Sequence, residues 1–404
     1  MTFLMIRFTS KVLETFSVLD MLKLEKTFAI AFSGGKDSTL LSILVYDWLR
    51  ERGIKGKKIV FVHNDTQSEL DILEDYARYF LNKICGLIRK TGNECDIMFT
   101  VPTHNFYWRV IVAGYPAPNF IFRWCVNHLK VLPNKEAMKK LVEKYGRVVL
   151  LTGHREDESS VRASIIKNNS VCDASSQSCN SSFFLKYDVK DVVKVMPIRH
   201  WTLDDVWEYL SEVKDEFGLD PLYRLYGDNK VARYGCWHCT LVKIQKNIYN
   251  LPARYYYLEG ARIIYRVVSD LEEMRMVKSW GRTKLGPLNA IGRGVMLKVF
   301  PVVEELSGMR LYGLDEAKID GYSLREVFYE LEPEKANELI QRSSNGIRLV
   351  DKARRLVPIE EIREVKVSEE MKEKIVQVAE LNDAYKVLSV KGKEYFLDIL
   401  NKIE

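Results

Sequence analysis

The chain has 404 residues, with 61 Lys and Arg against 55 Asp and Glu, which gives a formal net charge of +6. This length predicts two to three domains, and the hydrophobic fraction of 47% is typical of a globular protein with a large core. No apolar run approaches the roughly 18 residues that a membrane-spanning helix needs, and residues 1–6 lack the features of a signal peptide. We therefore expect a cytoplasmic protein with no membrane partner. The mild positive charge permits a nucleic-acid partner without requiring one.

The chain begins with an amphipathic helical pattern over residues 1–26, and an apolar run at 28–32 then predicts a buried strand. Ser-Gly-Gly-Lys-Asp-Ser-Thr follows at 33–39, before a helical pattern over 40–49. Glycines let a ligand approach the backbone, and the first amides of a helix attract anions. The Walker spacing is absent. The segment resembles the PP-loop of ATP pyrophosphatases, which implies that it holds the pyrophosphate of ATP through Ser33, Gly34, Gly35, Lys36, Asp37 and Ser38.

Further strands are predicted at 58–63 and 96–101, with a helix at 69–90 between them. This alternation predicts an α/β fold with a doubly wound parallel sheet. Ligands bind at the carboxyl ends of the strands in such sheets. Asp65 and Thr66 follow the second strand and are therefore candidates for contact with the adenosine half of ATP or with a magnesium ion. Helix capping is an equally compatible role for these two residues.

The segment from Pro102 to Phe122 is aromatic and irregular. Its aromatic faces suit a substrate-facing loop on which bases stack. A buried wrap around the edge of the sheet explains the same composition equally well. A helix over about 134–145 is expected after it.

A fourth strand is predicted at 147–152, and Gly153, Arg155 and Arg162 lie after it. These residues suit phosphate contacts, and a solvated charge cluster is the alternative. Residues 167–185 are polar and of low complexity, which predicts a long mobile loop that closes over an active site. A fifth strand is expected at 193–198, and Thr202 is expected to cap the next helix, with Asp205 three residues on.

The seven cysteines of a cytoplasmic protein indicate metal or sulfur chemistry rather than a disulfide framework. Cys236 and Cys239 form a C-x-x-C motif, and Cys125 follows Arg-Trp. Soft thiolates favour an iron–sulfur cluster or zinc, and we favour the cluster, with one iron left open or closed by Cys172 or Cys179. Two further cysteines are expected to be free thiols, Cys85 and Cys95.

Tyr and Arg interleave over residues 254–266, with arginines at 254, 262 and 266. Such a segment can stack bases and neutralise phosphates together. A helix that packs its tyrosines inward is the competing interpretation. We divide the chain into an N-terminal helix at 1–26, a PP-loop domain at 27–215, a cysteine-bearing helical extension at 216–300 and a small accessory domain at 301–404 of unknown role.

Three motifs together resemble the phosphoadenosine-phosphosulfate reductase branch of PP-loop proteins. They are residues 33–39, Thr-Gly-His-Arg-Glu-Asp-Glu-Ser at 152–159 with Arg162, and the segment from Pro197 to Trp207. Within that branch, the settings of Cys125, Cys236 and Cys239 and the later Gly-Pro-Leu at 286–288 resemble the DndC-type proteins of DNA phosphorothioation.

The resemblance covers about residues 25–300 and implies an adenine nucleotide alpha hydrolase-like fold. It implies ATP with Mg²⁺, a [4Fe-4S] cluster held by Cys125, Cys236, Cys239 and Cys172, and DNA as the acceptor. A cysteine desulfurase and other phosphorothioation proteins are the implied partners. The implied mechanism is adenylylation of a phosphate oxygen followed by sulfur attack that expels AMP. Lys36, Asp37 and Ser38 are the implied catalytic residues, because they meet the charge that develops on pyrophosphate.

The chain departs from the family at its cysteines, because none follows Cys239. A sulfonucleotide reductase would carry a nucleophilic cysteine near its C-terminus. A tRNA thiolase also combines this loop with cluster cysteines, although its C-x-x-C usually precedes the remaining cysteine. A non-enzymatic ATP-sensing module is the third alternative.

Overall fold

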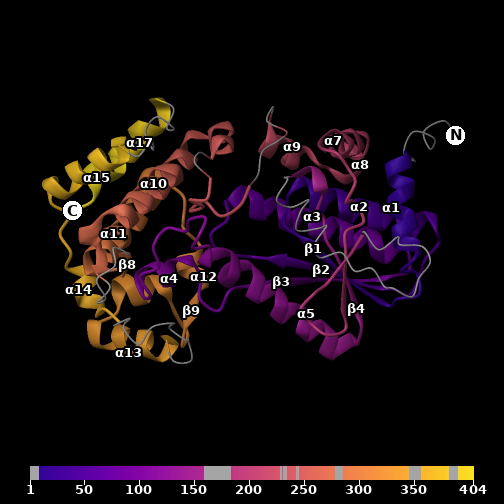
Figure 1. Cartoon of the computed structure of the whole chain (residues 1–404), viewed down its shortest axis with the longest axis horizontal. Helices are drawn as coiled ribbons and strands as arrows, with labels where there is room; N and C mark the ends of the chain where they lie inside the picture. Colours follow the sequence, from indigo (N-terminus) through magenta and orange to yellow (C-terminus); the bar gives the residue numbers. More distant parts are fainter. Residues whose placement is uncertain are drawn as a thin grey trace. The chain divides into compact units, whose positions relative to one another are not determined.

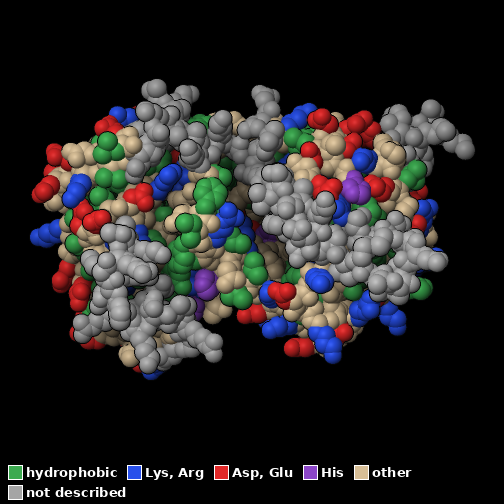
Figure 2. All heavy atoms as spheres, viewed as in Figure 1, with side chains coloured by type: hydrophobic (Ala, Val, Ile, Leu, Met, Phe, Trp, Pro, Cys, Tyr) green, Lys and Arg blue, Asp and Glu red, His purple; other side chains and the backbone are tan. Residues whose placement is uncertain are grey.

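The computed structural model describes residues 9–158, 183–227, 230, 234–242, 245–277, 285–344, 356–381 and 390–404 (Figure 1). The chain divides into two compact units. Unit 1 comprises Met1–Asp65, Asp71–Thr100 and Val131–Tyr234, and unit 2 comprises Thr66–Leu70, Val101–Lys130 and Gly235–Glu404. Acidic and basic side chains are interspersed over the face shown in Figure 2. Within the described ranges, no helix is long and apolar enough to cross a membrane.

Unit 1 is built on a six-stranded sheet with the order β3-β2-β1-β4-β6-β5. Every neighbouring pair is parallel except the last, in which β5 runs antiparallel to β6. The mainly parallel sheet confirms the predicted α/β fold. The strands are β1 (Thr27–Phe32), β2 (Lys58–Asn64), β3 (Glu94–Thr100), β4 (Val148–Leu151), β5 (Phe184–Leu185) and β6 (Val192–Val195).

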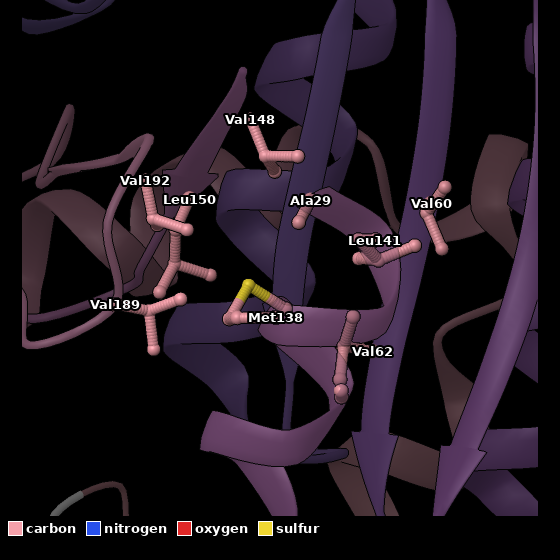
Figure 3. Packing of buried hydrophobic residues seen from close by; sticks show 10 residues of the cluster. Ala29, Val60, Val62, Met138, Leu141, Val148, Leu150, Val189 and Val192 are labelled. Atoms are coloured by element: carbon pink, nitrogen blue, oxygen red, sulfur yellow. The ribbon is translucent and has the colours of Figure 1, made fainter. Parts of the chain in front are cut away.

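Alternate residues of the buried strands face opposite sides of the sheet, and helices cover both sides. On one side, Met138 and Leu141 of α5 pack on a cluster that includes Ala29, Val60 and Val148 (Figure 3). On the other side, Phe28 meets Trp48 of α2, and Phe32 stacks on Phe80 of α3 at 5.3 Å. This two-sided cover is the doubly wound arrangement expected for a parallel sheet. The helices of unit 1 are α1 (Ser10–Asp20), α2 (Lys36–Glu51), α3 (Asp71–Lys90), α5 (Leu132–Tyr145), α7 (Leu203–Glu212), α8 (Lys214–Phe217) and α9 (Asp220–Tyr226), with the 3₁₀ turn η2 (Glu156–Glu158).

The helix cap expected at Thr202 is confirmed. The Thr202 side chain accepts a hydrogen bond from the Asp205 amide, and the Asp205 carboxylate accepts one from the Thr202 amide. This reciprocal capping box satisfies two of the amides that a helix start leaves unpaired, and it begins α7.

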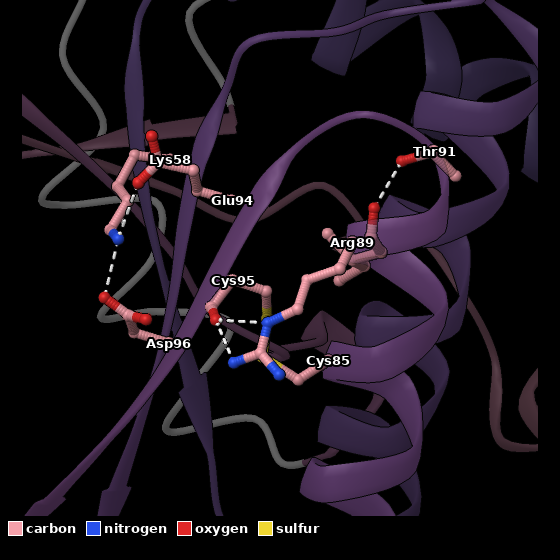
Figure 4. The surroundings of a disulfide bond; sticks show 8 residues. Lys58, Cys85, Arg89, Thr91, Glu94, Cys95 and Asp96 are labelled. Atoms are coloured by element: carbon pink, nitrogen blue, oxygen red, sulfur yellow. Dashed lines mark hydrogen bonds and ion pairs between the residues drawn. A yellow bond between two sulfur atoms is a disulfide. The ribbon is translucent and has the colours of Figure 1, made fainter.

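The expectation of free thiols at Cys85 and Cys95 is wrong, because the structure pairs them in a disulfide (Figure 4). Cys85 lies on α3 and Cys95 on β3, with their Cα atoms 5.4 Å apart. Arg89, one turn further along α3, donates to the carbonyl oxygen of Cys95. The turn between α3 and β3 therefore brings residues ten positions apart into bonding geometry.

Unit 2 is mainly helical. Its central helix α10 contacts α11, α15 and α17. The predicted domain boundary at residue 300 falls inside α11, and α4 lies within the segment that we expected to be irregular. The elements are α4 (Phe106–Ile111), α10 (Tyr256–Asp270), α11 (Ala290–Ser307), α12 (Gly313–Glu316), α13 (Pro333–Ser344), α14 (Ile359–Arg363), α15 (Glu369–Leu381) and α17 (Val390–Lys402), the hairpins β7 (Arg275–Val277) with β8 (Leu285–Leu288) and β9 (Lys318–Ile319) with β10 (Tyr322–Ser323), and the short turns η4 (Lys246–Asn250), η5 (Ala253–Tyr255), η6 (Glu272–Met274) and η7 (Glu326–Glu330). The π-helical turn η1 (Val126–Val131) leads from unit 2 into unit 1.

Candidate functional site

The glycine-rich loop joins β1 to α2 in unit 1. Gly34 has a positive φ of 74°, in the left-handed region that disfavours side chains. A Cβ at Gly34 would lie 3.3 Å from Leu73 of α3, so α3 packs closely behind the loop. Gly35 is the N-cap of α2, which places the first amides of this helix beside the loop. The predicted strand, turn and helix are thus confirmed, and the first amides of α2 follow directly after the two glycines.

Two serine hydroxyls hold the loop in shape. Ser38 Oγ accepts from the Ser33 amide at 3.2 Å and donates to the Gly35 carbonyl at 2.9 Å. Ser33 Oγ lies 3.2 Å from Ser38 Oγ and accepts from the Gly35 amide at 3.4 Å. Both serines of the predicted site therefore fix the turn, in addition to any contact with a ligand.

Lys36 is the first residue of α2 and is almost fully buried. Its ammonium lies 3.3 Å from the Asp37 carboxylate and 5.4 Å from the centre of the Tyr226 ring. The Tyr226 hydroxyl accepts a hydrogen bond from the Lys36 amide at 3.2 Å. Tyr226 ends α9, 190 residues further along the chain. Sequence reasoning missed Tyr226, because nothing in its local pattern links it to the loop.

Asp37 forms an ion pair with Arg155, whose Nε lies 2.7 Å from the carboxylate. Gly153 lies close to the same loop: a Cβ there would be 3.0 Å from the Asp37 backbone. The structure therefore brings Gly153 and Arg155 to the predicted loop. Because Arg155 already holds Asp37 and Asp157, it is a structural partner of the loop as well as a candidate phosphate ligand. Arg162 lies outside the described residues.

A buried polar network surrounds the carboxyl end of β2. His63 contacts the Phe32 carbonyl at 3.0 Å and the Glu74 carboxylate at 2.9 Å. Glu74 pairs with Arg78, which also lies 3.6 Å from Asp65. Burial lowers the pKa of His63, but the hydrogen bond and charge of Glu74, with the Phe32 carbonyl and the charge of Asp65, together raise it overall. Burial raises the pKa of Glu74, but His63 and Arg78 lower it overall. The predicted nucleotide or magnesium residue Asp65 thus sits beside a network that sequence reasoning did not find.

The three remaining described cysteines all lie in unit 2. The Cys239 amide donates to the Cys236 carbonyl at 3.1 Å. Burial, and then the nearby charge of Cys239, raise the pKa of Cys125 to about 11. Burial and the Glu69 carboxylate raise the pKa of Cys236 to about 12. The nearby Cys239 thus contributes to the raised pKa of both Cys125 and Cys236.

Thr66, the second residue predicted after β2, belongs to this cysteine group. Its hydroxyl lies 3.3 Å from Cys236 Sγ. Glu69 lies 3.5 Å from the same sulfur, and the Lys130 ammonium lies 3.4 Å from Glu69. The negative charges of Cys236 and Glu69 raise the pKa of Lys130. Thr66 is thus a neighbour of a thiol in unit 2, whereas Asp65 belongs to unit 1.

Three thiols are the donor type that suits an iron–sulfur cluster or zinc. Among the described residues, however, no three His, Cys, Asp or Glu side chains are arranged as a ready ligand group. The donor chemistry therefore fits a soft metal centre, whereas the arrangement of the thiols is not that of a formed site. The other candidate ligands, Cys172 and Cys179, lie outside the described residues.

Side chains from α10 and its approach hold the C-x-x-C turn by its carbonyls. Arg262 donates to the carbonyls of Cys239 at 3.2 Å and Val242 at 2.9 Å. Gln245 donates to the carbonyls of Cys236 at 3.3 Å and Trp237 at 3.1 Å. These four bonds fix the backbone of the turn that carries two of the thiols.

Arg262 is 1% exposed and forms a buried ion pair with Glu259. The expectation that Arg262 faces DNA phosphates is therefore wrong, because the guanidinium points into unit 2. Arg254 is exposed and Arg266 is half-buried. The inward-packing alternative holds for the helix as a whole, since Tyr265 is fully buried. The sequence could have indicated this ion pair, because Glu259 and Arg262 are three residues apart on a predicted helix and therefore lie on the same face.

The aromatic segment after β3 shows both expected behaviours. Phe106, Tyr107 and Trp108 lie on α4 and are buried. Phe120 is 73% exposed, and Phe122 is partly exposed. Of the aromatic side chains in this segment, Phe120 and Phe122 are therefore the ones that a ligand or partner could reach.

A mainly parallel sheet with a glycine-rich turn between its first strand and α2 defines an α/β domain of the doubly wound class, in which ligands bind at the carboxyl ends of the strands. The sequence matches the phosphoadenosine phosphosulfate reductase domain over residues 27–242, which is more than half of the chain. The chain belongs to this family, as the resemblance of its motifs predicted.

Two of the curated relatives of this chain are similar to parts of it. An uncharacterized protein of Methanocaldococcus jannaschii is 29% identical over 226 residues, or 55% of this chain. Adenosine 5'-phosphosulfate reductase 1 of Bacillus subtilis is 30% identical over 116 residues, or 29% of this chain. Each match spans 38% of the relative's length.

Two solved structures are also similar. A PAPS reductase from Candida auris, in a phosphate complex, covers 56% of this chain and 90% of its own, with 14% identity and a TM-score of 0.32. The U34-tRNA thiolase NcsA from Methanococcus maripaludis, with its [4Fe-4S] cluster, covers 55% of this chain and 74% of its own, with 15% identity and a TM-score of 0.32. At these scores neither structure adds to the assignment.

Proposed function

We propose that this chain is an ATP-dependent sulfurtransferase that activates a DNA phosphate by adenylylation so that sulfur can replace an oxygen. The observation that carries the proposal is the gathering of Cys125, Cys236 and Cys239 in one unit of a chain that also has the phosphate loop around Lys36. Thiols without a phosphate loop would suggest a plain metal centre. A loop without thiols would suggest a nucleotide-binding domain of another kind.

The first step is the attack of a non-bridging phosphate oxygen of DNA on the α-phosphorus of ATP, which forms a new P–O bond and releases pyrophosphate. Lys36 and the amides at the start of α2 stabilise the negative charge that develops on the departing pyrophosphate. Arg155 holds Asp37 at 2.7 Å and so keeps the acidic side chain of the loop in place. Asp65 is the candidate for a carboxylate that meets Mg²⁺.

In the second step, sulfur at the sulfide level attacks the activated phosphorus, a P–S bond forms, and AMP leaves with the oxygen that had joined the two phosphorus atoms. A cysteine desulfurase is the proposed sulfur source, and because its persulfide sulfur is two electrons more oxidised than sulfide, a thiol reductant is proposed to release it as sulfide. When bound to Cys125, Cys236 and Cys239, a [4Fe-4S] cluster would supply an iron site that carries the sulfur. Arg262 and Gln245 keep the carbonyls of the C-x-x-C turn bonded, which holds Cys236 and Cys239 on one rigid turn.

The cluster is tested without any activity assay. Protein purified without oxygen is expected to absorb visible light and to contain iron and acid-labile sulfide. Serine at Cys125, Cys236 or Cys239 is expected to remove most of the iron, because each change deletes a soft ligand. The matched control is Cys85→Ser/Cys95→Ser, which breaks the disulfide and leaves the three thiols intact. Stoichiometric zinc with no sulfide would contradict the cluster.

A sulfonucleotide reductase is the second candidate, and the identity to the Bacillus subtilis enzyme favours it. Residues 240–404 contain no cysteine that could serve as the late nucleophile of such a reductase. Release of sulfite from adenylyl sulfate with a thiol reductant would support this candidate. Release of pyrophosphate from ATP that requires added DNA would support the sulfurtransferase.

A further inference from the structure

A short loop in unit 2, residues 118–125, presents two apolar side chains to solvent at its tip. Phe120 is 73% exposed, and Ile121 is 99% exposed. We call this segment the tip loop. The centres of exposed turns usually carry Gly, Asn, Asp or Ser, so two large apolar residues at this position require an explanation.

Side-chain hydrogen bonds hold the backbone of the tip loop in its turn. The Asn119 side chain accepts hydrogen bonds from the amides of Ile121 at 2.9 Å and Phe122 at 2.8 Å, which closes the turn. Trp124 is buried, and its ring nitrogen donates to the Pro116 carbonyl at 2.8 Å. Phe120 and Ile121 are therefore exposed on a turn whose backbone is held in place by hydrogen bonds to the Asn119 side chain.

Phe122 and Trp124 both pack on the ring of Tyr115. The Phe122 ring stacks parallel to it at 6.1 Å, and the Trp124 ring lies 4.8 Å from it. The adjacent Ala117 amide donates to Ser269 of α10 at 2.8 Å. Phe122 and Trp124 thus hold the loop against Tyr115, whereas Phe120 and Ile121 make up its most exposed part.

The tip loop carries one charged side chain, that of Arg123. The Arg123 guanidinium lies 5.4 Å from the centre of the Phe120 ring, and its Nε donates to the Phe120 carbonyl at 3.3 Å. The sequence contains no Asp or Glu from residue 97 to residue 135, although the chain as a whole has 55. An aromatic ring with a guanidinium beside it, and no acidic residue nearby in sequence, is complementary to a base and its phosphate.

We infer that the tip loop is a DNA-contacting wedge, in which Phe120 and Ile121 enter between bases and Arg123 meets a phosphate. Apolar side chains that part a base step are an established way to distort duplex DNA. The inference rests on the proposed function, since it names the part of the chain that meets the DNA acceptor. The tip loop ends at Cys125, five residues after Phe120. The residues that would meet DNA are therefore close in sequence to a candidate ligand of the iron–sulfur cluster.

The guanidinium beside the exposed ring favours a nucleic acid over an apolar protein partner, because Arg123 can pair with a phosphate while Phe120 stacks on a base.

The test uses the full chain and a DNA duplex that carries 2-aminopurine, whose emission rises when it is unstacked. Wild-type protein is expected to bind the duplex and raise the emission. Phe120→Ala/Ile121→Ala is expected to lose the rise and to bind about tenfold more weakly or worse. Arg123→Gln is expected to lower the slope of log affinity against log salt by about 0.9, the value for one phosphate contact. Leu24→Ala, which truncates another side chain that is 87% exposed, is expected to match the wild type.

The outcomes separate the wedge from the proposed function. If the double variant binds DNA and raises emission like the wild type, the wedge is wrong and DNA remains the acceptor. If wild-type protein binds no DNA, or binds tRNA or a protein through the tip instead, both the wedge and the DNA acceptor are wrong. Because both residues are exposed, the double variant should keep the wild-type melting temperature, so loss of binding in a folded variant supports the wedge.

Discussion

The hydroxyl of Tyr226 lies 3.2 Å from the backbone nitrogen of Lys36 and accepts its hydrogen bond. That amide belongs to the first turn of α2, where the proposed function places the pyrophosphate of ATP. Tyr226 is 3% exposed, and its ring also meets Trp207 at 5.0 Å. A neutral hydroxyl therefore occupies a donor that a phosphate oxygen would use.

Replacement of Tyr226 by Phe should strengthen the binding of pyrophosphate. The change removes the competing acceptor and keeps the ring, so the Lys36 amide is free for the ligand. One ordinary hydrogen bond is worth about 0.5–1.5 kcal/mol, so the dissociation constant should fall about twofold to tenfold. Calorimetric titration with pyrophosphate measures the change.

Tyr223→Phe is the matched control for this titration. Tyr223 lies on the same helix and also packs on Trp207, at 5.2 Å, but its hydroxyl lies beside Ser211 of α7 rather than the glycine-rich loop. It should bind pyrophosphate like the wild type. Weaker binding by Tyr226→Phe would mean that the Tyr226 hydroxyl contacts the ligand directly.

Lys36→Ala should reduce pyrophosphate release from ATP by about a hundredfold to a thousandfold, the effect of losing one key transition-state donor. The fold should persist, because the serine hydroxyls and the Asp37–Arg155 pair still hold the loop. Lys135→Ala removes a lysine that pairs with the exposed Asp188, and it should leave the rate unchanged. Release at the wild-type rate by Lys36→Ala would remove the loop from the mechanism.

The local parts of the fold could be predicted because their causes lie within short segments. The apolar run at 28–32, the two glycines and the spacing over 40–49 act within about twenty residues. The capping box at Thr202 and Asp205 involves only four. Strand, turn and cap patterns report such local preferences directly.

The contacts that were missed join residues by tertiary packing. Tyr226 and Lys36 are 190 positions apart, and the Cys85–Cys95 bond depends on how α3 returns along β3. Arg262 was misread because an Arg and Tyr pattern on a helix looks the same whether the guanidinium meets phosphate or a buried carboxylate. The composition of the helix does not distinguish an arginine that binds phosphate from one that is buried against a carboxylate. The ion pair with Glu259 in the structure makes that distinction.

Arg262→Met should destabilise the protein strongly. It leaves the Glu259 carboxylate buried without its partner, which costs about 3–5 kcal/mol in the free energy of unfolding. The double change Glu259→Met/Arg262→Met should recover much of that loss, because no unpaired charge remains. Urea unfolding measures both.

Arg254→Gln, at an exposed arginine of the same region, should change the free energy of unfolding by less than about 0.5 kcal/mol. An Arg262→Met variant of wild-type stability that had lost DNA affinity would instead return Arg262 to the DNA-binding surface.

The His63–Glu74 pair should make stability depend on pH. His63 faces two acceptors, the Phe32 carbonyl and the Glu74 carboxylate, so only the doubly protonated ring donates to both. Its raised pKa means that this stabilisation is complete below the ordinary value of 6.5 and is lost as pH rises through the folded value. The pKa of Glu74 is lowered in the folded protein, so the stabilisation that its carboxylate contributes is present above its ordinary pKa of 4.5. This stabilisation is lost as pH falls through the pKa of Glu74 in the folded state.

Glu74→Gln should therefore lower the free energy of unfolding by about 1–3 kcal/mol near pH 6 and by less near pH 8.5. Glu94→Gln is the control, because Glu94 is exposed and pairs with Lys58 at the surface of the sheet. A Glu74→Gln effect that is equal at both pH values would show that the His63 charge does not contribute.

The central claim is that this chain helps to place sulfur on a DNA phosphate. Its most direct test is nuclease digestion of cellular DNA, followed by mass spectrometry of the dinucleotides, in cells with and without the chain. The account predicts sulfur-containing dinucleotides that vanish on deletion and return with the wild-type chain but not with Lys36→Ala. Unchanged DNA together with the loss of a thiolated tRNA base would contradict it.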